Sequence, residues 1–150
     1  MNNFILLDTG PLGLISNPQG AGPTEQCNLW LDDRLAQGFR VLVPEIADYE
    51  LRRELVRAGK IKGIAKLNGL KRSLGFLPIT RRSMLKAADF WAQARRIGKQ
   101  TASDFALDGD VILAAQGAIL QDSGRKVIIA TTNVKHLELF IDASFWSDIS

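Results

Sequence analysis

The sequence predicts an α/β fold, a three-layer sandwich in which a mostly parallel central sheet of four to five strands lies between layers of helices. One observation is the run 4–7, which is apolar at every position and too short for a helix, as in a strand covered on both faces. The other is that such runs alternate with longer amphipathic segments that end at glycines. Strands joined by helical crossovers are parallel, because these crossovers are right-handed in nearly all proteins.

The first half of the chain alternates strands with capped helices. Thr24 is suited to cap a helix whose apolar side carries Leu31 and Leu35 and which stops at Gly38. Pro44 opens the next helix. The expected elements are a strand at 4–7, a short helix at 11–16, a helix at 24–37, a strand at 40–43, and helices at 45–58 and 60–74.

The second half repeats this alternation. The expected elements are a strand at 76–79, a helix at 83–97, a loop at 101–107, a helix at 108–124 and a strand at 126–131. The helix at 83–97 has apolar residues at helical spacing, and Trp91 is expected in the core with them. That predicted buried stripe consists of Met84, Ala87, Ala88, Trp91 and Ala94.

The composition is that of one soluble domain spanning residues 1–150. Hydrophobic residues make up 46% of the chain, enough for one sizeable core. A single cysteine, Cys27, excludes an internal disulfide and a multi-thiolate metal site. No charged-then-apolar leader is recognisable, and no apolar run approaches the ~18 residues that cross a bilayer. We therefore expect a reduced, cytoplasmic protein that does not enter membranes.

The net charge of +3 conceals a strong asymmetry along the chain. Between Arg52 and Lys99 there are fourteen Lys or Arg residues and only two acids, Glu54 and Asp89. We name residues 52–99 the basic segment and predict that it forms a phosphate-binding surface. The alternative is a solvated face that only confers solubility.

An acidic residue follows the first strand. Asp8 stands directly after Leu7, and in open parallel sheets ligands bind at this edge, where strand ends and helix starts leave unpaired backbone donors. Alternatively, Asp8 only caps the following helix, with Gly10 in a tight turn and Pro11 at the first helical position. Other polar side chains at the same edge decide between these interpretations.

A second acid projects from an apolar helix face. By 3.6-residue periodicity Glu50 shares its face with Ile46, Ala47 and Leu51. An unpaired buried carboxylate is costly, so Glu50 should meet a cation, a donor or the sheet edge at Asp8. The alternative is a surface glutamate at the border of the apolar stripe.

Two more polar residues reach the same edge. Asp108 fits the N-cap of the helix at 108–124 and Asp110 its first turn, so that one of the two acids is free for chemistry. The strand at 126–131 places Asn133 at its carboxyl end. Asp8, Glu50, Asp110 and Asn133 can therefore converge on one edge of the sheet.

These side chains suit a hard metal ion. Three acids in one crevice stay ionised only if a cation compensates their charge, and oxygen ligands without His or Cys favour Mg²⁺ or Mn²⁺ over zinc. Such an ion activates water and neutralises charge on a phosphodiester. The predicted reaction is phosphodiester hydrolysis, with the basic segment contacting a long anionic substrate.

The sequence resembles the PIN domains, and especially the VapC-type toxins of bacterial toxin–antitoxin pairs. The matching stretches are I-L-L-D-T-G-P at 5–11, P-E-I-A-D-Y-E-L at 44–51, D-V-I-L-A-A at 110–115 and A-T-T-N at 130–133. Each stretch is weakly specific alone. Together they occur in the family's order over nearly the whole chain.

The resemblance implies a Mg²⁺-dependent endoribonuclease. Asp8, Glu50 and Asp110 fall on the family's metal-binding positions, and Asn133 falls where many members carry a fourth acid. Asp108 is an alternative or additional ligand. The resemblance also implies a homodimer and a cognate antitoxin protein as partner.

Other activities fit less well. The triplet at 8–10 also spells the aspartic-protease motif, but those enzymes are all-β. A phosphatase with Asp8 as nucleophile would carry a second acid at position 10, and a phosphoacceptor domain would carry acids before the strand end. The main alternative is a PIN-like RNA-binding or partner-binding module with weak or absent catalysis. His136, the single histidine, is assigned no role.

Overall fold

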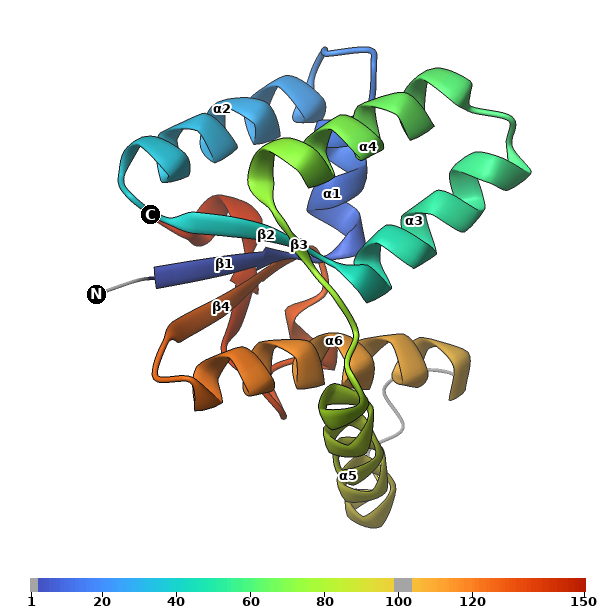
Figure 1. Ribbon diagram of the computed structural model, residues 1–150, viewed down its shortest axis with the longest axis vertical. Coiled ribbons are helices and arrows are strands. Elements are labelled where there is room, and N and C mark those ends of the chain that lie inside the picture. The colour runs from blue at the N-terminus through green and yellow to red at the C-terminus, as the bar shows by residue number, and fades with distance from the viewer. Residues whose placement is uncertain (1–2, 99–103) are drawn as a thin grey trace.

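Five parallel strands form the central sheet of the computed structural model, which describes residues 3–98 and 104–150. β1 lies in the middle of the order β3-β2-β1-β4-β5, with Leu6 opposite Leu42 of β2 and Ile129 of β4 (Figure 1). The predicted parallel α/β sheet is confirmed, with a fifth strand from the tail. The strands are β1 (Asn3–Leu7), β2 (Arg40–Pro44), β3 (Phe76–Leu77), β4 (Lys126–Thr131) and β5 (Ala143–Phe145).

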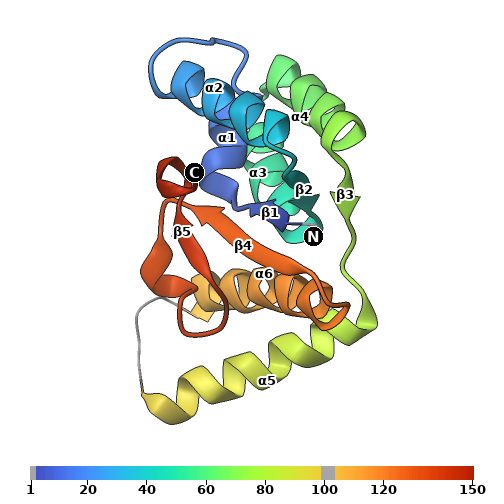
Figure 2. The ribbon, with the colours of Figure 1, turned by 90° about the vertical axis from the view of Figure 1, so that its left-hand side faces the viewer.

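Helices cover both faces of the sheet and complete three layers (Figures 1 and 2). α1 to α4 lie on one side, and α6 lies on the other with α5 outside it. Within the described ranges, no helix has the length and apolar character that a membrane span requires. The helices are α1 (Thr9–Ser16), α2 (Pro23–Ala36), α3 (Glu45–Arg57), α4 (Ile61–Leu74), α5 (Arg81–Ile97) and α6 (Asp104–Asp122), with short 3-10 turns η1 (Val134–His136) and η2 (Trp146–Asp148).

The apolar run of β1 supplies both hydrophobic cores. Phe4 and Leu6 point into the core beneath α6, whereas Ile5 and Leu7 point into the core beneath α1 and α4. Successive side chains of a strand face opposite ways, so a strand covered on both sides is apolar throughout. Each fully buried Leu or Ile contributes about 1.5–3 kcal/mol to folding. The central position of β1 fixes its carboxyl end between the two helical layers.

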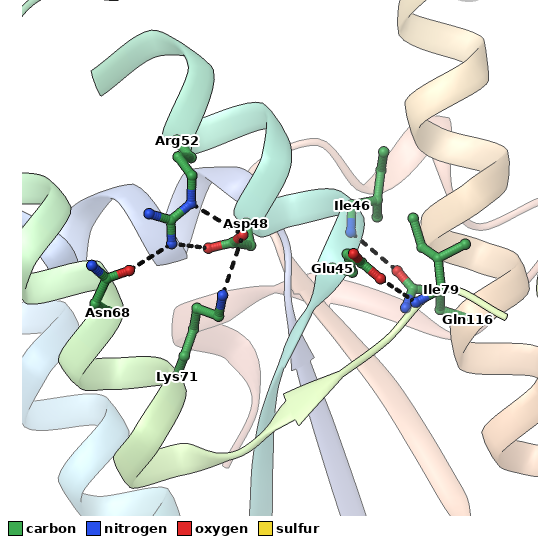
Figure 3. Close-up of polar contacts among 8 residues, drawn as sticks. All are labelled: Glu45, Ile46, Asp48, Arg52, Asn68, Lys71, Ile79 and Gln116. Carbon is green, nitrogen blue, oxygen red and sulfur yellow. Dashed lines mark hydrogen bonds and ion pairs between the residues drawn. The ribbon is translucent and has the colours of Figure 1, made fainter. Parts of the chain in front are cut away.

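The start of α3 is fixed to α6 and to the segment after β3 by side-chain hydrogen bonds (Figure 3). Glu45 Oε1 accepts from the Ile79 N–H at 2.6 Å. Gln116, buried on α6, accepts from the Ile46 N–H at 3.3 Å and donates to the Leu77 carbonyl oxygen at 2.8 Å. These bonds hold α3 in one place relative to α6.

A buried acid on α3 is neutralised from within the same layer (Figure 3). Asp48 accepts from Arg52 at 2.8 Å, and the Lys71 ammonium of α4 lies 3.6 Å from its other oxygen. Arg52 also donates to Asn68 of α4 at 2.8 Å. Two cations of the basic segment thus join α3 to α4.

The basic segment is divided between the two helical layers. Its residues lie on α3 and α4 on one side of the sheet and on α5 on the other, because the chain crosses the sheet at β3 (Figure 1). Arg57 and Arg82 pair with the exposed acids Glu54 and Asp122 at 2.9 and 3.3 Å. The positive charge of this segment therefore lies on helices of both layers, and the phosphate-binding surface stays a prediction.

The buried stripe of α5 differs from the predicted one. Phe90 is 9% exposed, whereas Trp91 is 39% exposed and Met84 45%, so the prediction that Trp91 belongs to the core is wrong. Phe90 stacks on Phe140 with 5.0 Å between ring centroids. Two apolar stripes run along α5, and packing against α6 selects the one with Ser83, Ala87 and Phe90.

Three helices start differently from prediction. α6 begins at Asp104, so Asp108 is not an N-cap and Asp110 lies beyond the first turn. The first part of the predicted loop at 101–107 lies outside the described residues. α1 begins at Thr9 without a preceding turn, so its proline is not at the first position. α2 begins at Pro23 after Gly22, and Leu35, expected on its apolar side, is exposed.

Candidate active site

Asp8 is held rigidly at the carboxyl end of β1. Its Oδ1 accepts from the Thr9 N–H at 2.7 Å, and its Oδ2 accepts from the Thr131 hydroxyl at 2.7 Å. Thr131 ends β4 and is fully buried. Asp8 therefore caps α1 and is also aimed at the sheet edge, so the two interpretations of this residue are compatible.

Close packing at this edge explains the glycine after Asp8 and Thr9. A Cβ on Gly10 would lie 2.6 Å from the Thr132 hydroxyl oxygen. Real Cβ atoms do not approach other heavy atoms so closely. Gly10 thus lets the first turn of α1 lie against the end of β4.

Glu50 reaches the same place from α3. Its Oε1 accepts from the Thr9 hydroxyl at 3.1 Å. Its Oε2 would lie 2.5 Å from a Cβ added at Gly109 on α6. The glycine of the D-G-D sequence thus makes room for the Glu50 carboxylate.

Asp110 completes a group of three acids. Burial first, and then the charges of Asp8 and Glu50, raise its pKa to about 7. Burial also raises the pKa of Asp8. Its hydrogen bonds with Thr131 and Thr9, and its electrostatic interaction with His136, lower this pKa by less. The three predicted carboxylates therefore gather within electrostatic reach of one another.

Burial likewise raises the pKa of Glu50. The hydrogen bond from Thr9 lowers this pKa, the charge of Asp8 raises it, and the charge of Arg53 lowers it. Arg53 is exposed on the same helix, with its guanidinium 5.1 Å from the ring centre of Tyr49. A cation therefore stands beside the acids on the α3 side.

Asn133 lies beside the acids rather than among them. Its N–H donates to the Thr131 hydroxyl oxygen at 2.9 Å, and its amide nitrogen lies 3.1 Å from His136 Nδ1. The Thr131 hydroxyl thus accepts from Asn133 and donates to Asp8. This one side chain links the ends of β1 and β4.

His136, to which the sequence assigned no role, belongs to this site. Its Nδ1 lies 3.3 Å from Asp110 Oδ2. With the ring proton on Nε2, Nδ1 accepts from Asn133; with the proton on Nδ1, it donates to Asp110. The position of a histidine three residues after Asn133, at a strand end, was the available signal. Thr9, Thr131 and Gly109 were missed as well, because only their contacts reveal them.

Asp108 occupies a different side of α6. It is exposed and lines a groove between α5 and α6 with Met84, Trp91 and Ile112. Residues two positions apart on a helix point about 200° apart. The structure thus brings Asp110, and not Asp108, to Asp8 and Glu50.

Three solved structures that this chain resembles are VapBC proteins. No protein-family profile matches the chain, and no curated protein matches it. VapBC2 from Rickettsia felis bound to a DNA fragment from its promoter has a TM-score of 0.69 at 16% identity, covering 94% of this chain and 97% of that one. VapBC-1 from nontypeable Haemophilus influenzae has a TM-score of 0.67 at 14% identity, covering 97% and 99%. DNA-bound VapBC from Salmonella typhimurium has a TM-score of 0.63 at 18% identity, also covering 97% and 99%.

The chain has a PIN-like fold. The resemblance to VapC-type PIN domains, drawn from four short stretches, is thus confirmed at the level of the fold. At these identities the match carries no residue roles, so the roles within this PIN-like fold rest on the geometry described above.

The acids of the PIN-like fold suit a hard cation by their chemistry. Among residues 3–98 and 104–150, no three His, Cys, Asp or Glu side chains stand in an arrangement that could hold a metal ion. The metal site thus stays a prediction. In its favour, the charges of Asp8 and Glu50 add to burial in raising the pKa of Asp110, so a cation near these acids would favour their ionised forms. Carboxylate oxygens are the ligands that Mg²⁺ and Mn²⁺ prefer.

Proposed function

We propose that this protein is a metal-dependent endoribonuclease and the toxin of a toxin–antitoxin pair. The observation that carries this proposal is the gathering of Asp8, Glu50 and Asp110 at the carboxyl edge of a parallel sheet, each with a raised pKa. The VapBC structures that share the fold support a toxin. RNA as substrate follows from the resemblance to VapC-type domains.

In this proposal the three acids share one task. Asp8, Glu50 and Asp110 would hold Mg²⁺ or Mn²⁺, which when bound supplies the Lewis acidity for phosphodiester hydrolysis. Thr9 and Thr131 orient two of the carboxylates, since each donates its hydroxyl proton to one of them.

Substrate contacts in this proposal come from both sides of the acids. Arg53, exposed beside Glu50 on α3, binds a phosphate of the RNA, because its charge already acts at the site. Asn133 and His136 stand on the β4 side and offer hydrogen bonds to the ribose or phosphate. Asn133 contributes no charge where many relatives have an acid, which reduces the capacity for a second ion.

The partners are proposed as well. A cognate antitoxin is the expected protein partner, since the structural neighbours are VapBC complexes. A homodimer follows from the family resemblance. Large apolar side chains exposed on α5, among them Leu85 and Trp91, offer apolar surface for association.

A PIN-like binding module without catalysis is the second candidate. Two observations favour it: the neutral Asn133, and the lack of a formed metal-binding arrangement within the described part of the chain. The module would bind RNA or a partner through the same surface without needing a divalent ion.

Cleavage of a mixed cellular RNA pool separates the two candidates. Purified protein is incubated with Mg²⁺, with EDTA, and as the Asp8→Asn variant, with Asp89→Asn on exposed α5 as the matched control. The nuclease cuts RNA with Mg²⁺, and EDTA and Asp8→Asn each abolish cutting while Asp89→Asn does not. RNA binding without cutting by folded protein, unaffected by Mg²⁺ and by Asp8→Asn, would establish the module.

A further inference from the structure

A small cavity lies next to the acids on the side of β4. It is bounded by α5, by α6 and by the segment that follows β4, has a volume of about 260 Å³, and is walled by Ala94, Leu107, His136, Leu139 and Phe140. Figure 2 shows the segment after β4 running beside the start of α6. The proposed function assigns no role to this cavity.

His136 joins the cavity to the acids. Its ring forms part of the cavity wall, while its Nδ1 lies 3.3 Å from Asp110 Oδ2. Whatever occupies the cavity is therefore one side chain away from the proposed reaction centre.

The wall chemistry suits a flat aromatic group. Phe140 is held by stacking on Phe90, with ring planes inclined by 30°, and Leu107 and Leu139 add aliphatic surface. Apolar and aromatic walls bind nucleobases, because every base has a π-face whatever its sequence.

Charges at the cavity also distinguish a base from a phosphate. Lys135 and Glu138 both border it, and both are exposed. Their opposite charges leave no net attraction for an anion inside the cavity. Lys135 can contact the sugar–phosphate chain at the mouth, whereas Glu138 can accept a hydrogen bond from a base.

We propose that this cavity binds the base of the RNA nucleotide next to the phosphate that is cut, and so selects the cleavage site. This proposal rests on the proposed nuclease function, whose substrate it specifies further. His136 contacts both the base and the acid group. The identity of the preferred base then depends on Leu139 and Glu138 rather than on the carboxylates.

Filling the cavity tests this proposal. Leu139→Trp places a large ring in it from a partly exposed position, and Leu29→Trp adds the same ring at an exposed position of α2 as a control. Cut sites are mapped by sequencing the ends of the cleaved RNA, and thermal unfolding verifies that both variants are folded. Leu139→Trp should reduce cutting beside the preferred base by about tenfold relative to other bases, the effect of losing one stacked base. Leu29→Trp should keep the wild-type base preference.

A second readout does not depend on cleavage. The wild-type protein and Leu139→Trp are titrated with short RNA oligonucleotides and followed by NMR at Ala94, Leu107 and Phe140. Chemical-shift changes at these residues that occur in the wild type and not in Leu139→Trp support the base-binding cavity. If the protein cuts no RNA, these changes still support the cavity, whereas the nuclease proposal fails. A folded Leu139→Trp with the wild-type base preference, or the absence of shifts at the cavity, would overturn the subsite alone.

Discussion

The side chain of Asp110 ionises near neutral pH, because burial and the charges of Asp8 and Glu50 raise its pKa to about 7. An acid whose pKa is higher in the folded protein than its ordinary value of 3.8 favours folding only while it is protonated. Its contribution to stability is therefore complete below that value and is lost as the pH rises through about 7.

Asp110→Asn should therefore stabilise the protein at high pH. The expected gain is small at about pH 4 and on the order of 1–2 kcal/mol, or ~3–6 °C in Tm, at about pH 8. Thermal unfolding at both pH values measures it, with Asp108→Asn, on another side of α6, as the control. Equal gains at the two pH values would show that Asp110 does not titrate as described.

Thr131 orients Asp8 through one hydroxyl group, which donates to Asp8 and accepts from the Asn133 N–H. Thr131→Val keeps the shape and removes the hydroxyl, so we expect RNA cleavage to fall by about 10- to 100-fold. The free energy of unfolding should fall by about 1–2 kcal/mol, because Asp8 Oδ2 and the Asn133 N–H lose a partly buried hydrogen-bond partner. Thr131→Ser, which keeps the hydroxyl, is the control. Wild-type cleavage by a folded Thr131→Val would show that Thr131 does not orient Asp8 for the reaction.

The acids of the site could be predicted because each has a local signal. Asp8 follows an apolar strand and Glu50 interrupts an apolar helix face. The residues that orient them, such as Thr9 and Thr131, have no such signal, since their partners come from elements 41 and 123 positions away. His136 had a local signal, its position three residues after Asn133 at a strand end, but only its contact with Asp110 shows that it belongs to the site.

At the level of elements, Gly109 of α6 makes room for the Glu50 carboxylate, although a glycine inside a helix lowers its stability. Gly109→Ala should favour the helix by up to about 1 kcal/mol. The new methyl group would also displace the Glu50 carboxylate, whose Oε2 lies 2.5 Å from the added Cβ. We expect cleavage to fall by about tenfold or more, as for a displaced ligand, with stability little changed.

Gly69→Ala on α4 is the matched control for this substitution. A Cβ there meets only the end of the Arg72 side chain, at 4.0 Å. Urea unfolding and cleavage rates of the two variants should show that Gly69→Ala gains stability and keeps activity. Full activity in Gly109→Ala would contradict the position of Glu50.

Two predictions about helices were wrong because they depend on how the elements pack. α5 presents two adjacent apolar stripes, and the sequence does not reveal which one α6 covers, so Trp91 was placed in the core in place of Phe90. The start of α6 was placed four residues late, because the D-G-D sequence imitates a helix cap. The buried face of α5 and the start of α6 both depend on packing between elements.

At the level of the whole molecule, the parallel sheet decides where the site lies. Alternating apolar strands and helices were enough to predict the sheet, its direction and the edge where the acids meet. The distribution of charge was not predictable in this way. Folding divides the basic segment between two layers and uses Arg52 and Lys71 to neutralise Asp48.

Two neighbouring arginines on α3 should therefore behave differently. Arg53→Gln should weaken RNA binding and reduce the slope of log affinity against log salt by about one, because a phosphate contact is lost. Arg52→Gln should instead lower stability, by about 1–3 kcal/mol, because Asp48 loses a buried partner. RNA binding at several salt concentrations, together with urea unfolding, distinguishes them, and the reverse pattern would refute the assignment.

The central claim is that Asp8, Glu50 and Asp110 together hold a divalent cation. Isothermal titration with Mn²⁺ tests this most directly, using wild-type protein, Asp8→Asn, and Asp89→Asn as the control. We expect Asp8→Asn to weaken Mn²⁺ binding by about tenfold or more, with Asp89→Asn binding as the wild type does. Equal binding by all three proteins, or none by the folded wild type, would contradict the claim.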